Sequence, residues 1–300
     1  MKQIFSFVIF IVCLSTFSCH TKVSPQVSSA NQESTDTHGN PMLLGKCTKE
    51  RLEAKPYGDW FNKNYSDYLI DTATAEKLKN TLSGKNFVIF MGTWCGDSKR
   101  EVSRMFKILE YCGVKPNRIQ LIMVDSHDST YNQSPTHEER GLNIHRVPDL
   151  LVYSNNQEMG RIVESPVTSL EKDLVTITSG QQYIPKYQIV PMLVTLFQQK
   201  NLKDIENELP DLASQAKPLM YHFAELNSYG YVLMAAGEMD KARISFRLNA
   251  LLYPENAGVF ASLGEYYLKI GDKNLAKENC LKAVQIQADN EDAKKILDQL

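Results

Sequence analysis

The 300-residue sequence has no basic tract, no acidic tail and no close pair of cysteines. Its formal net charge is −2, so nothing in its composition suggests nucleic-acid binding. The six cysteines are scattered, which excludes a disulfide scaffold and the paired spacing of a zinc site. The sequence therefore implies no nucleic acid, no metal and no organic cofactor.

Long apolar runs are also missing, apart from one near the N-terminus. Lys2 precedes an apolar run from Ile4 to Leu14, which is shorter than the ~20 residues of a membrane-spanning helix. The pattern predicts an export signal over residues 1–18. Cys19 directly follows and resembles the cleavage site of bacterial lipoproteins, whose new N-terminal cysteine carries lipid. We expect a lipoprotein anchored on the periplasmic side of a bacterial cell envelope, with plain secretion or an uncleaved anchor as alternatives.

The segment after the signal is rich in Ser, Thr, Asn and Gln and shows no apolar periodicity. Residues 19–45 are therefore predicted to be a flexible tether. Two domains follow, over residues 46–182 and 183–300. Disulfides can persist outside the cytosol, but Cys13 would leave with the signal and lipid would block Cys19. Four thiols remain in the body of the protein, at positions 47, 95, 112 and 280.

The first domain alternates strand-like and helix-like patterns. Continuous apolar runs predict buried strands, and apolar residues at positions 102, 105, 106 and 109 predict a helix after Cys95. The predicted order begins with a helix at 73–82, a strand at 86–92 and the helix after Cys95. Strands at 118–125, 148–154 and 160–164 follow, and then a helix at 169–180. We expect an α/β domain.

Beyond residue 187 the pattern is helical throughout, and a repeat of 34 residues is visible. Gly230, Gly237 and Ala242 recur as glycine or alanine 34 positions later, which aligns residues 222–255 with 256–289. The spacing resembles the tetratricopeptide repeat, a helix–turn–helix unit. The resemblance implies an all-α domain whose surface either binds a protein partner or packs against the first domain.

Small residues in the repeats are expected to let two helices approach closely. Bulkier residues such as Phe246 would then fill the seam between them. Cys280 occupies the position that is equivalent to Phe246, so we interpret it as an inert buried thiol.

The stretch "WCGDS" places Cys95 at the start of a predicted helix. Unpaired N–H groups and the positive end of the helix dipole favour a thiolate there. Ser98 follows three residues later, so its hydroxyl can reach the sulfur. Lys99 and Arg100 add positive charge nearby, whereas Asp97 opposes ionisation. The sequence predicts a nucleophilic thiol.

"WCGDS" after a strand, followed about fifty residues later by "IHRVPDLLVY", resembles the thioredoxin family. The resemblance covers about residues 80–180. It implies a central sheet with flanking helices and a cis peptide between Val147 and Pro148, in a loop that packs beside the thiol and holds substrate backbone. Trp94 is a candidate substrate contact with packing as the alternative, and Arg146 is a further candidate contact.

Two positions depart from that family. Ser98 stands where the second cysteine of the thioredoxin disulfide would be, and Ile89 stands at the position of the proton-relay acid. Both argue against a dithiol reductase. The Pro and Thr that precede a peroxidatic cysteine are also missing, which argues against a peroxidase.

What remains is single-thiol chemistry of a reductase or isomerase type. Cys95 would attack disulfides of exported proteins and be released by an external reductant. Cys47 is a candidate resolving thiol if the segment around it folds over the site. The alternative is a non-catalytic adaptor that binds envelope proteins through the same cleft and the helical repeats.

The segment 125–145 is rich in acidic residues and histidines, including His127, His137 and His145. These residue types make a metal site conceivable. We instead expect a solvated loop near the active face.

Overall fold

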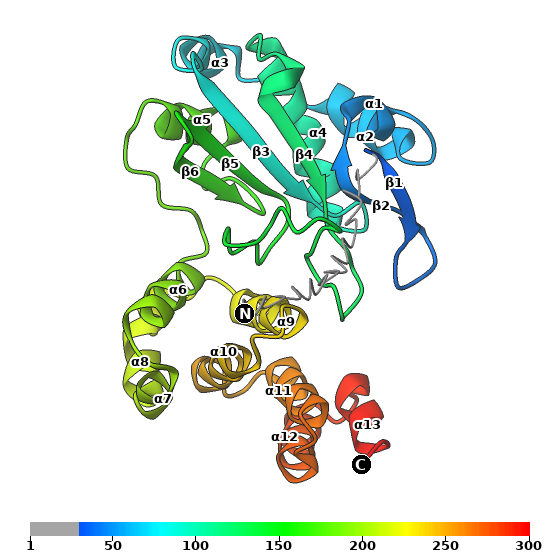
Figure 1. Ribbon diagram of the computed structural model, residues 1–300, viewed down its shortest axis with the longest axis vertical. Helices are drawn as coiled ribbons and strands as arrows, with labels where there is room; N and C mark the ends of the chain where they lie inside the picture. Colours follow the sequence, from blue (N-terminus) through cyan, green and yellow to red (C-terminus); the bar gives the residue numbers. More distant parts are fainter. Residues whose placement is uncertain (1–29) are drawn as a thin grey trace, which may run out of the picture.

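The computed structural model describes residues 30–300. The predicted signal peptide and Cys19 lie outside the described residues. The N-terminal half forms a mixed six-stranded sheet, and the C-terminal half contains helices alone among the described residues (Figure 1). We call residues 30–178 the sheet part and residues 189–300 the helical part. The strands are β1 (Gln32–Thr35), β2 (Pro41–Cys47), β3 (Lys85–Met91), β4 (Ile119–Met123), β5 (Asp149–Ser154) and β6 (Gln157–Val163).

The predicted tether at 19–45 is wrong for its described portion. Strands β1 and β2 form an antiparallel hairpin, and β2 pairs with β4 in the sheet. Met42 and Leu43 are fully buried, so this segment belongs to the domain. The polar composition of β1 suits its place at the edge of the sheet, where one side of the backbone faces solvent.

The strand order is β1-β2-β4-β3-β5-β6. Strands β3 and β4 are parallel, whereas β5 pairs antiparallel with β3 and with β6. The turn between β5 and β6 consists of Asn155 and Asn156, both with positive φ, a backbone conformation that asparagine tolerates. The expected strands and helices of this part thus agree with the structure, with β6 beginning earlier than predicted.

Helices cover one face of the sheet. Successive side chains of a strand point to opposite faces, and Phe87, Ile89 and Met91 of β3 pack into the larger core together with apolar residues from the helices. Those helices are α1 (Lys49–Glu53), α2 (Gly58–Asp67), α3 (Thr72–Lys79), α4 (Gly96–Tyr111) and α5 (Leu170–Thr178). A short 3₁₀ helix, η1 (Pro116–Arg118), leads into β4.

A loop covers the opposite face, where flanking helices were expected. Phe90 of β3 packs there with Ile122, Ile144 and Val147 in a second, smaller core. The loop from 124 to 148 is also not the solvated loop that composition predicts, because Asn132 is fully buried in it. Figure 1 shows this segment extending from the sheet toward α9.

The helical part contains nine of the described helices, counting one short 3₁₀ turn. They are α6 (Ile189–Gln199), α7 (Leu202–Asn207), α8 (Leu209–Ala216), η2 (Lys217–Leu219), α9 (Ala224–Ala235), α10 (Met239–Leu252), α11 (Ala257–Lys269), α12 (Lys273–Ile286) and α13 (Glu291–Leu297). None of the helices within residues 30–300 is long and apolar enough to cross a membrane.

The 34-residue repeat corresponds to two helical hairpins, α9–α10 and α11–α12. A Cβ at Gly230 would lie 2.5 Å from the Phe246 ring, and one at Gly264 would lie 2.4 Å from the Cys280 sulfur. The predicted seam is therefore present, with Cys280 buried in it. Gly237 has a different role from the expected one: its φ of +76° ends α9 in a left-handed turn, and a Cβ there would touch nothing within 4 Å.

Candidate functional site

The segment between β3 and α4 carries the cysteine and is fixed at three points. The Thr93 hydroxyl accepts a hydrogen bond from the Leu43 N–H of β2 at 3.2 Å. The Trp94 indole donates to the Val124 carbonyl at 3.0 Å, just beyond β4. The Gly92 N–H donates to the Ser98 hydroxyl in α4 at 3.3 Å. Two neighbouring strands and the following helix therefore set the position of Cys95.

Cys95 is the N-cap residue of α4 and is half-buried. Its backbone is extended, and no side chain caps the first turn. The first N–H groups of a helix have no acceptor within the helix, so these donors are open to an anion. In the structure the sulfur donates instead to the Val147 carbonyl at 3.2 Å.

Ser98 was predicted to contact the sulfur, but its hydroxyl is turned elsewhere. It is fully buried, and its oxygen accepts the Gly92 N–H. Among the described residues it makes no hydrogen bond to Cys95. The side chain therefore holds the turn in front of the helix, a structural role that the sequence spacing did not reveal.

Trp94 lies against backbone on one side and an aromatic ring on the other. A Cβ at Gly92 would lie 2.4 Å from the indole, so only glycine fits beneath it. The indole centroid is 6.0 Å from that of Tyr131, in the loop that covers the sheet. Both side chains remain partly exposed. The tryptophan thus packs and also borders the site.

The loop before β5 brings the predicted proline beside the thiol. The peptide bond between Val147 and Pro148 is cis, as the sequence resemblance implies. Asp149 then turns away from the site: it is fully buried and pairs with Arg161 at 3.1 Å. Burial raises the pKa of Asp149 to about 7, although Arg161 opposes this shift. Cys95, Val147 and Pro148 are therefore brought together as expected.

Arg146 was predicted to contact substrate, but its donors serve the contact between the two parts of the protein. It pairs with Glu164 of the sheet part and donates to the Ala224 carbonyl and the Ser228 hydroxyl of the helical part, both at 3.3 Å. Its guanidinium also lies over the Tyr187 ring. Substrate contact by Arg146 would require these interactions to break.

Cys47 does not lie near Cys95. Leu43 of β2 bonds to Thr93 at the site end of the strand, and Cys47 follows four residues later, about 13 Å along the strand at ~3.3 Å per residue. Cys47 instead lines a pocket with Phe106 and Glu110 near the far end of α4. The prediction of Cys47 as a resolving thiol is therefore wrong for this conformation.

The remaining thiols are buried to differing degrees. Burial raises the pKa of Cys47 to about 12 and the pKa values of Cys112 and Cys280 to about 11. These values lie well above that of an ordinary cysteine. The three thiols are thus protonated at neutral pH.

The histidines of the covering loop have nearby partners. His127 contacts Asp125 at 2.6 Å, and His137 contacts Glu139 at 3.0 Å. His145 is buried, and burial lowers its pKa to about 3. Within residues 30–300 no group of three or more His, Cys, Asp or Glu side chains is arranged to hold a metal ion.

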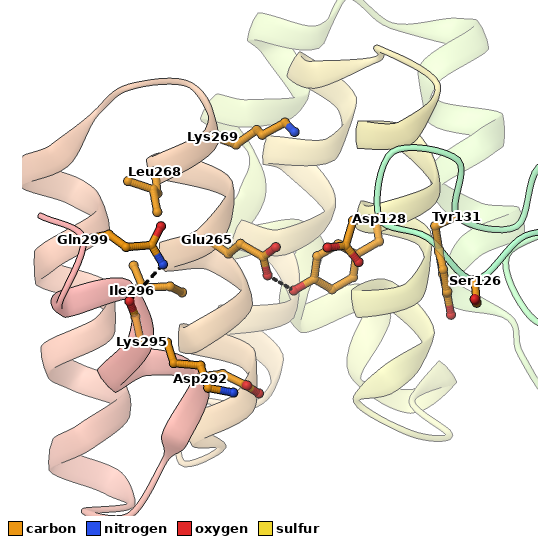
Figure 2. A pocket seen from close by; sticks show the side chains of 11 residues that line it. Ser126, Asp128, Tyr131, Glu265, Leu268, Lys269, Asp292, Lys295, Ile296 and Gln299 are labelled. Atoms are coloured by element: carbon orange, nitrogen blue, oxygen red, sulfur yellow. Dashed lines mark hydrogen bonds between the residues drawn. The ribbon is translucent and has the colours of Figure 1, made fainter. Parts of the chain in front are cut away.

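A cleft of about 620 Å³ opens where the covering loop meets the helical part. Figure 2 shows its lining: Ser126, Asp128 and Tyr131 from the loop face side chains of α11 and α13. Tyr231 of α9 donates a hydrogen bond to Glu265 at 2.7 Å within it. Tyr131 lines this cleft, and its ring centroid lies 6.0 Å from that of Trp94, the residue before Cys95.

Sequence reasoning missed Thr93, Tyr131 and Glu265. Thr93 and Tyr131 had a local signal, since the first lies within the conspicuous "GTWCGDS" stretch and the second is an aromatic residue in a polar loop. Glu265 had none, because a helix surface carries many such carboxylates and only the assembled fold brings it to the cleft.

The chain matches no protein-family model, and no curated protein matches it significantly.

Proposed function

We propose that this protein is an exported thiol–disulfide handling protein that acts through the single thiol of Cys95. In this proposal the sheet part is a thioredoxin-like domain and the helical part is an array of tetratricopeptide-like repeats. The observation that supports it most directly is the position of Cys95: it is the N-cap residue of a helix of 16 residues, its side chain is half-buried, and its sulfur lies 3.2 Å from the carbonyl oxygen that precedes the cis proline.

The chemistry begins with loss of the thiol proton to water. The N–H groups at the start of α4 then donate hydrogen bonds to the thiolate, which no longer contacts the carbonyl. The Cys95 thiolate attacks one sulfur of a substrate disulfide, so that a mixed disulfide forms and the other substrate sulfur leaves as a thiolate.

Two routes release the enzyme. Another thiolate of the same substrate attacks the mixed disulfide, which isomerises the substrate with no net redox change. Alternatively, an external thiol attacks, and a second equivalent of that thiol completes reduction of the substrate. Within residues 30–300 no resolving thiol is placed beside Cys95, since Ser98 cannot form a disulfide and Cys47 lies at the other end of β2.

One observation favours the adaptor as a second candidate. A carbonyl oxygen accepts hydrogen bonds but cannot donate them, so the contact between Cys95 and Val147 stabilises the protonated thiol. If that contact persists in solution, the site binds extended chains without exchanging disulfides. The two candidates thus differ in the protonation state of one sulfur.

Alkylation of each thiol against pH separates them. We expect iodoacetamide to modify Cys95 at pH 7 at least tenfold faster than Cys112 in the folded protein, because burial raises the pKa of Cys112 to about 11. The modified residues are identified by mass spectrometry of peptides. Equal, slow modification of both thiols would refute the nucleophilic role and leave the adaptor.

A trapping experiment tests the substrate class. The variant with Cys95 as the only cysteine in the described residues is expected to form mixed disulfides with envelope proteins, and these should disappear with Cys95→Ala. Retention of full biological function by Cys95→Ala would instead support the adaptor.

A further inference from the structure

The charged side chains that line the cleft of about 620 Å³ form no ion pairs among the described residues. Five charged side chains line it: Asp128, Glu265, Lys269, Asp292 and Lys295. None of the five forms an ion pair within residues 30–300. Three carboxylates against two ammonium groups leave a net negative lining, and the volume of about 620 Å³ lies within the range of ligand pockets.

Glu265 is the half-buried member of this set, whereas the other four charged side chains are exposed. Burial raises the pKa of Glu265, and the hydrogen bond from Tyr231 opposes this shift. The nearby charges of Asp128 and Asp292 also raise the pKa, whereas Lys269 lowers it. A cation that entered the cleft would relieve this repulsion.

A row of aromatic rings links the cleft to Trp94, the residue before Cys95. Tyr131 forms its wall on the side of the sheet, with the Trp94 ring 6.0 Å away on one side and the Tyr231 ring 6.4 Å away on the other. This row ends at Trp94 on the side of the sheet part and at Tyr231, whose hydroxyl donates to Glu265, on the side of the helical part.

We propose that this cleft binds an extended polypeptide segment through a lysine or arginine side chain that pairs with Glu265. The basic residue anchors the segment while its neighbouring part passes Tyr131 toward Cys95. The disulfide chemistry of that neighbouring part rests on the proposed function of Cys95. The binding step does not.

Two fluorescein-labelled decapeptides that differ only in lysine or glutamine at one central position test the binding step. Anisotropy titration of the full chain is expected to give at least fivefold tighter binding of the lysine peptide, the effect of one partly buried ion pair. Glu265→Gln keeps an oxygen for the Tyr231 hydroxyl but removes the charge, and should reduce the difference to less than twofold.

Glu278→Gln provides the matched control, because Glu278 is an exposed carboxylate of α12 outside the cleft. This variant should discriminate between the peptides as the unaltered protein does. Raising NaCl from 50 mM to 1 M should diminish the preference, since salt screens charge pairs. Equal binding of the two peptides, or an unchanged preference in Glu265→Gln, overturns the proposal.

Alkylation of Cys95 by iodoacetamide, measured in parallel, keeps the two proposals separate. Glu265→Gln should leave this rate unchanged, since iodoacetamide carries no charge. If Cys95 is unreactive while the lysine peptide is preferred, the proposed function fails and the cleft assignment stands. If Cys95 is reactive and no preference exists, the cleft assignment fails alone.

Discussion

The contact between the Cys95 sulfur and the Val147 carbonyl has opposite effects on the two forms of the thiol. It stabilises the neutral form, which donates the hydrogen bond, and it repels the anion. The open N–H groups of α4 have the reverse preference. In the proposed function, loss of the thiol proton would therefore exchange the carbonyl contact for contacts with these N–H groups.

Neutralising Asp97 tests how charge at the helix start acts on Cys95. Asp97 lies in the first turn of α4, and its carboxylate accepts a hydrogen bond from Arg100 at 2.6 Å. Asp97→Asn removes a negative charge near the sulfur and leaves Arg100 positive. We expect alkylation of Cys95 at pH 7 to become about twofold faster, the effect of ~0.5 kcal/mol.

Asp59→Asn is the control for this variant, since Asp59 holds the same place in the first turn of α2. It should leave the Cys95 rate unchanged. The effect of Asp97→Asn should also shrink at 1 M salt. An unchanged rate in Asp97→Asn would show that the aspartate does not act on the thiol.

The stability of the protein should depend on Glu225. This residue is fully buried, one oxygen accepts the Val190 N–H at 3.0 Å, and the other has no partner among the described residues. Burial raises its pKa from 4.5 to about 7. The folded state thus favours the protonated form, and the stabilisation present below pH 4.5 is lost as pH rises through 7.

Urea unfolding at pH 5 and pH 8 measures this loss. The free energy of unfolding should fall between these values, and Glu225→Gln should lessen the fall by about 1–3 kcal/mol. Asp149 contributes in the same direction and the buried His145 in the opposite direction, and both contributions are shared by the variant. Glu255→Gln, an exposed control, should not alter it. An identical fall in Glu225→Gln would contradict the assignment.

At the scale of elements, the sequence was sufficient to predict a strand or helix wherever that element has its own apolar run or helical periodicity. Apolar runs located β3, β4 and β5, and a periodicity of 3.6 located α4. The hairpin of β1 and β2 was not predicted because β1 is polar on both faces, and only its pairing with β2, which in turn pairs with β4, makes it a strand. Tertiary contacts of this kind leave no periodicity to detect.

The repeat seam offers a test between two helices. Gly264→Ala places a Cβ 2.4 Å from the Cys280 sulfur, so we expect a loss of about 1–3 kcal/mol in the free energy of unfolding. Cys280→Ala removes the obstructing atom. The double variant should therefore lose at least ~1 kcal/mol less than the sum of the single variants, measured by urea unfolding.

Gly258→Ala is the control within the same helix, α11. A Cβ there would contact only the Asn256 side chain, at 3.3 Å. Stability should stay the same or rise by up to ~1 kcal/mol, because alanine favours helix over glycine. Additive losses in the Gly264 and Cys280 variants would show that the seam adjusts without a clash.

At the scale of the whole molecule, the sheet part and the helical part have separate cores. The sequence located the thiol and the proline loop of the site because each lies within a short motif. It could not locate the cleft, whose walls come from a loop near residue 130 and helices beyond residue 230. The sequence also suggested that Arg146 contacts substrate. Its actual partners could not be seen in the sequence, because they lie 18 to 82 positions away in the chain.

Arg146 allows a test of how the two parts are joined. It links Glu164 to Ala224 and Ser228, with 19% of its side chain exposed. Both tryptophans, Trp60 and Trp94, lie in the sheet part, so their fluorescence reports that part, whereas circular dichroism at 222 nm reports mainly the helical part. In the unaltered protein the two urea transitions should coincide, as in cooperative unfolding. Arg146→Gln should separate them, because the link is lost while both cores remain.

Arg243→Gln completes this experiment, because Arg243 pairs with Glu206 inside the helical part and reaches no residue of the sheet part in its ion pairs. This variant should lower the urea midpoint of the transition at 222 nm. The midpoint of the fluorescence transition should fall by the same amount or less. If Arg146→Gln unfolds as one transition, the parts are held together by their remaining contacts and the arginine is dispensable. Separated transitions would mean that the geometry of the cleft, and with it the path from Glu265 to Cys95, depends on this one guanidinium.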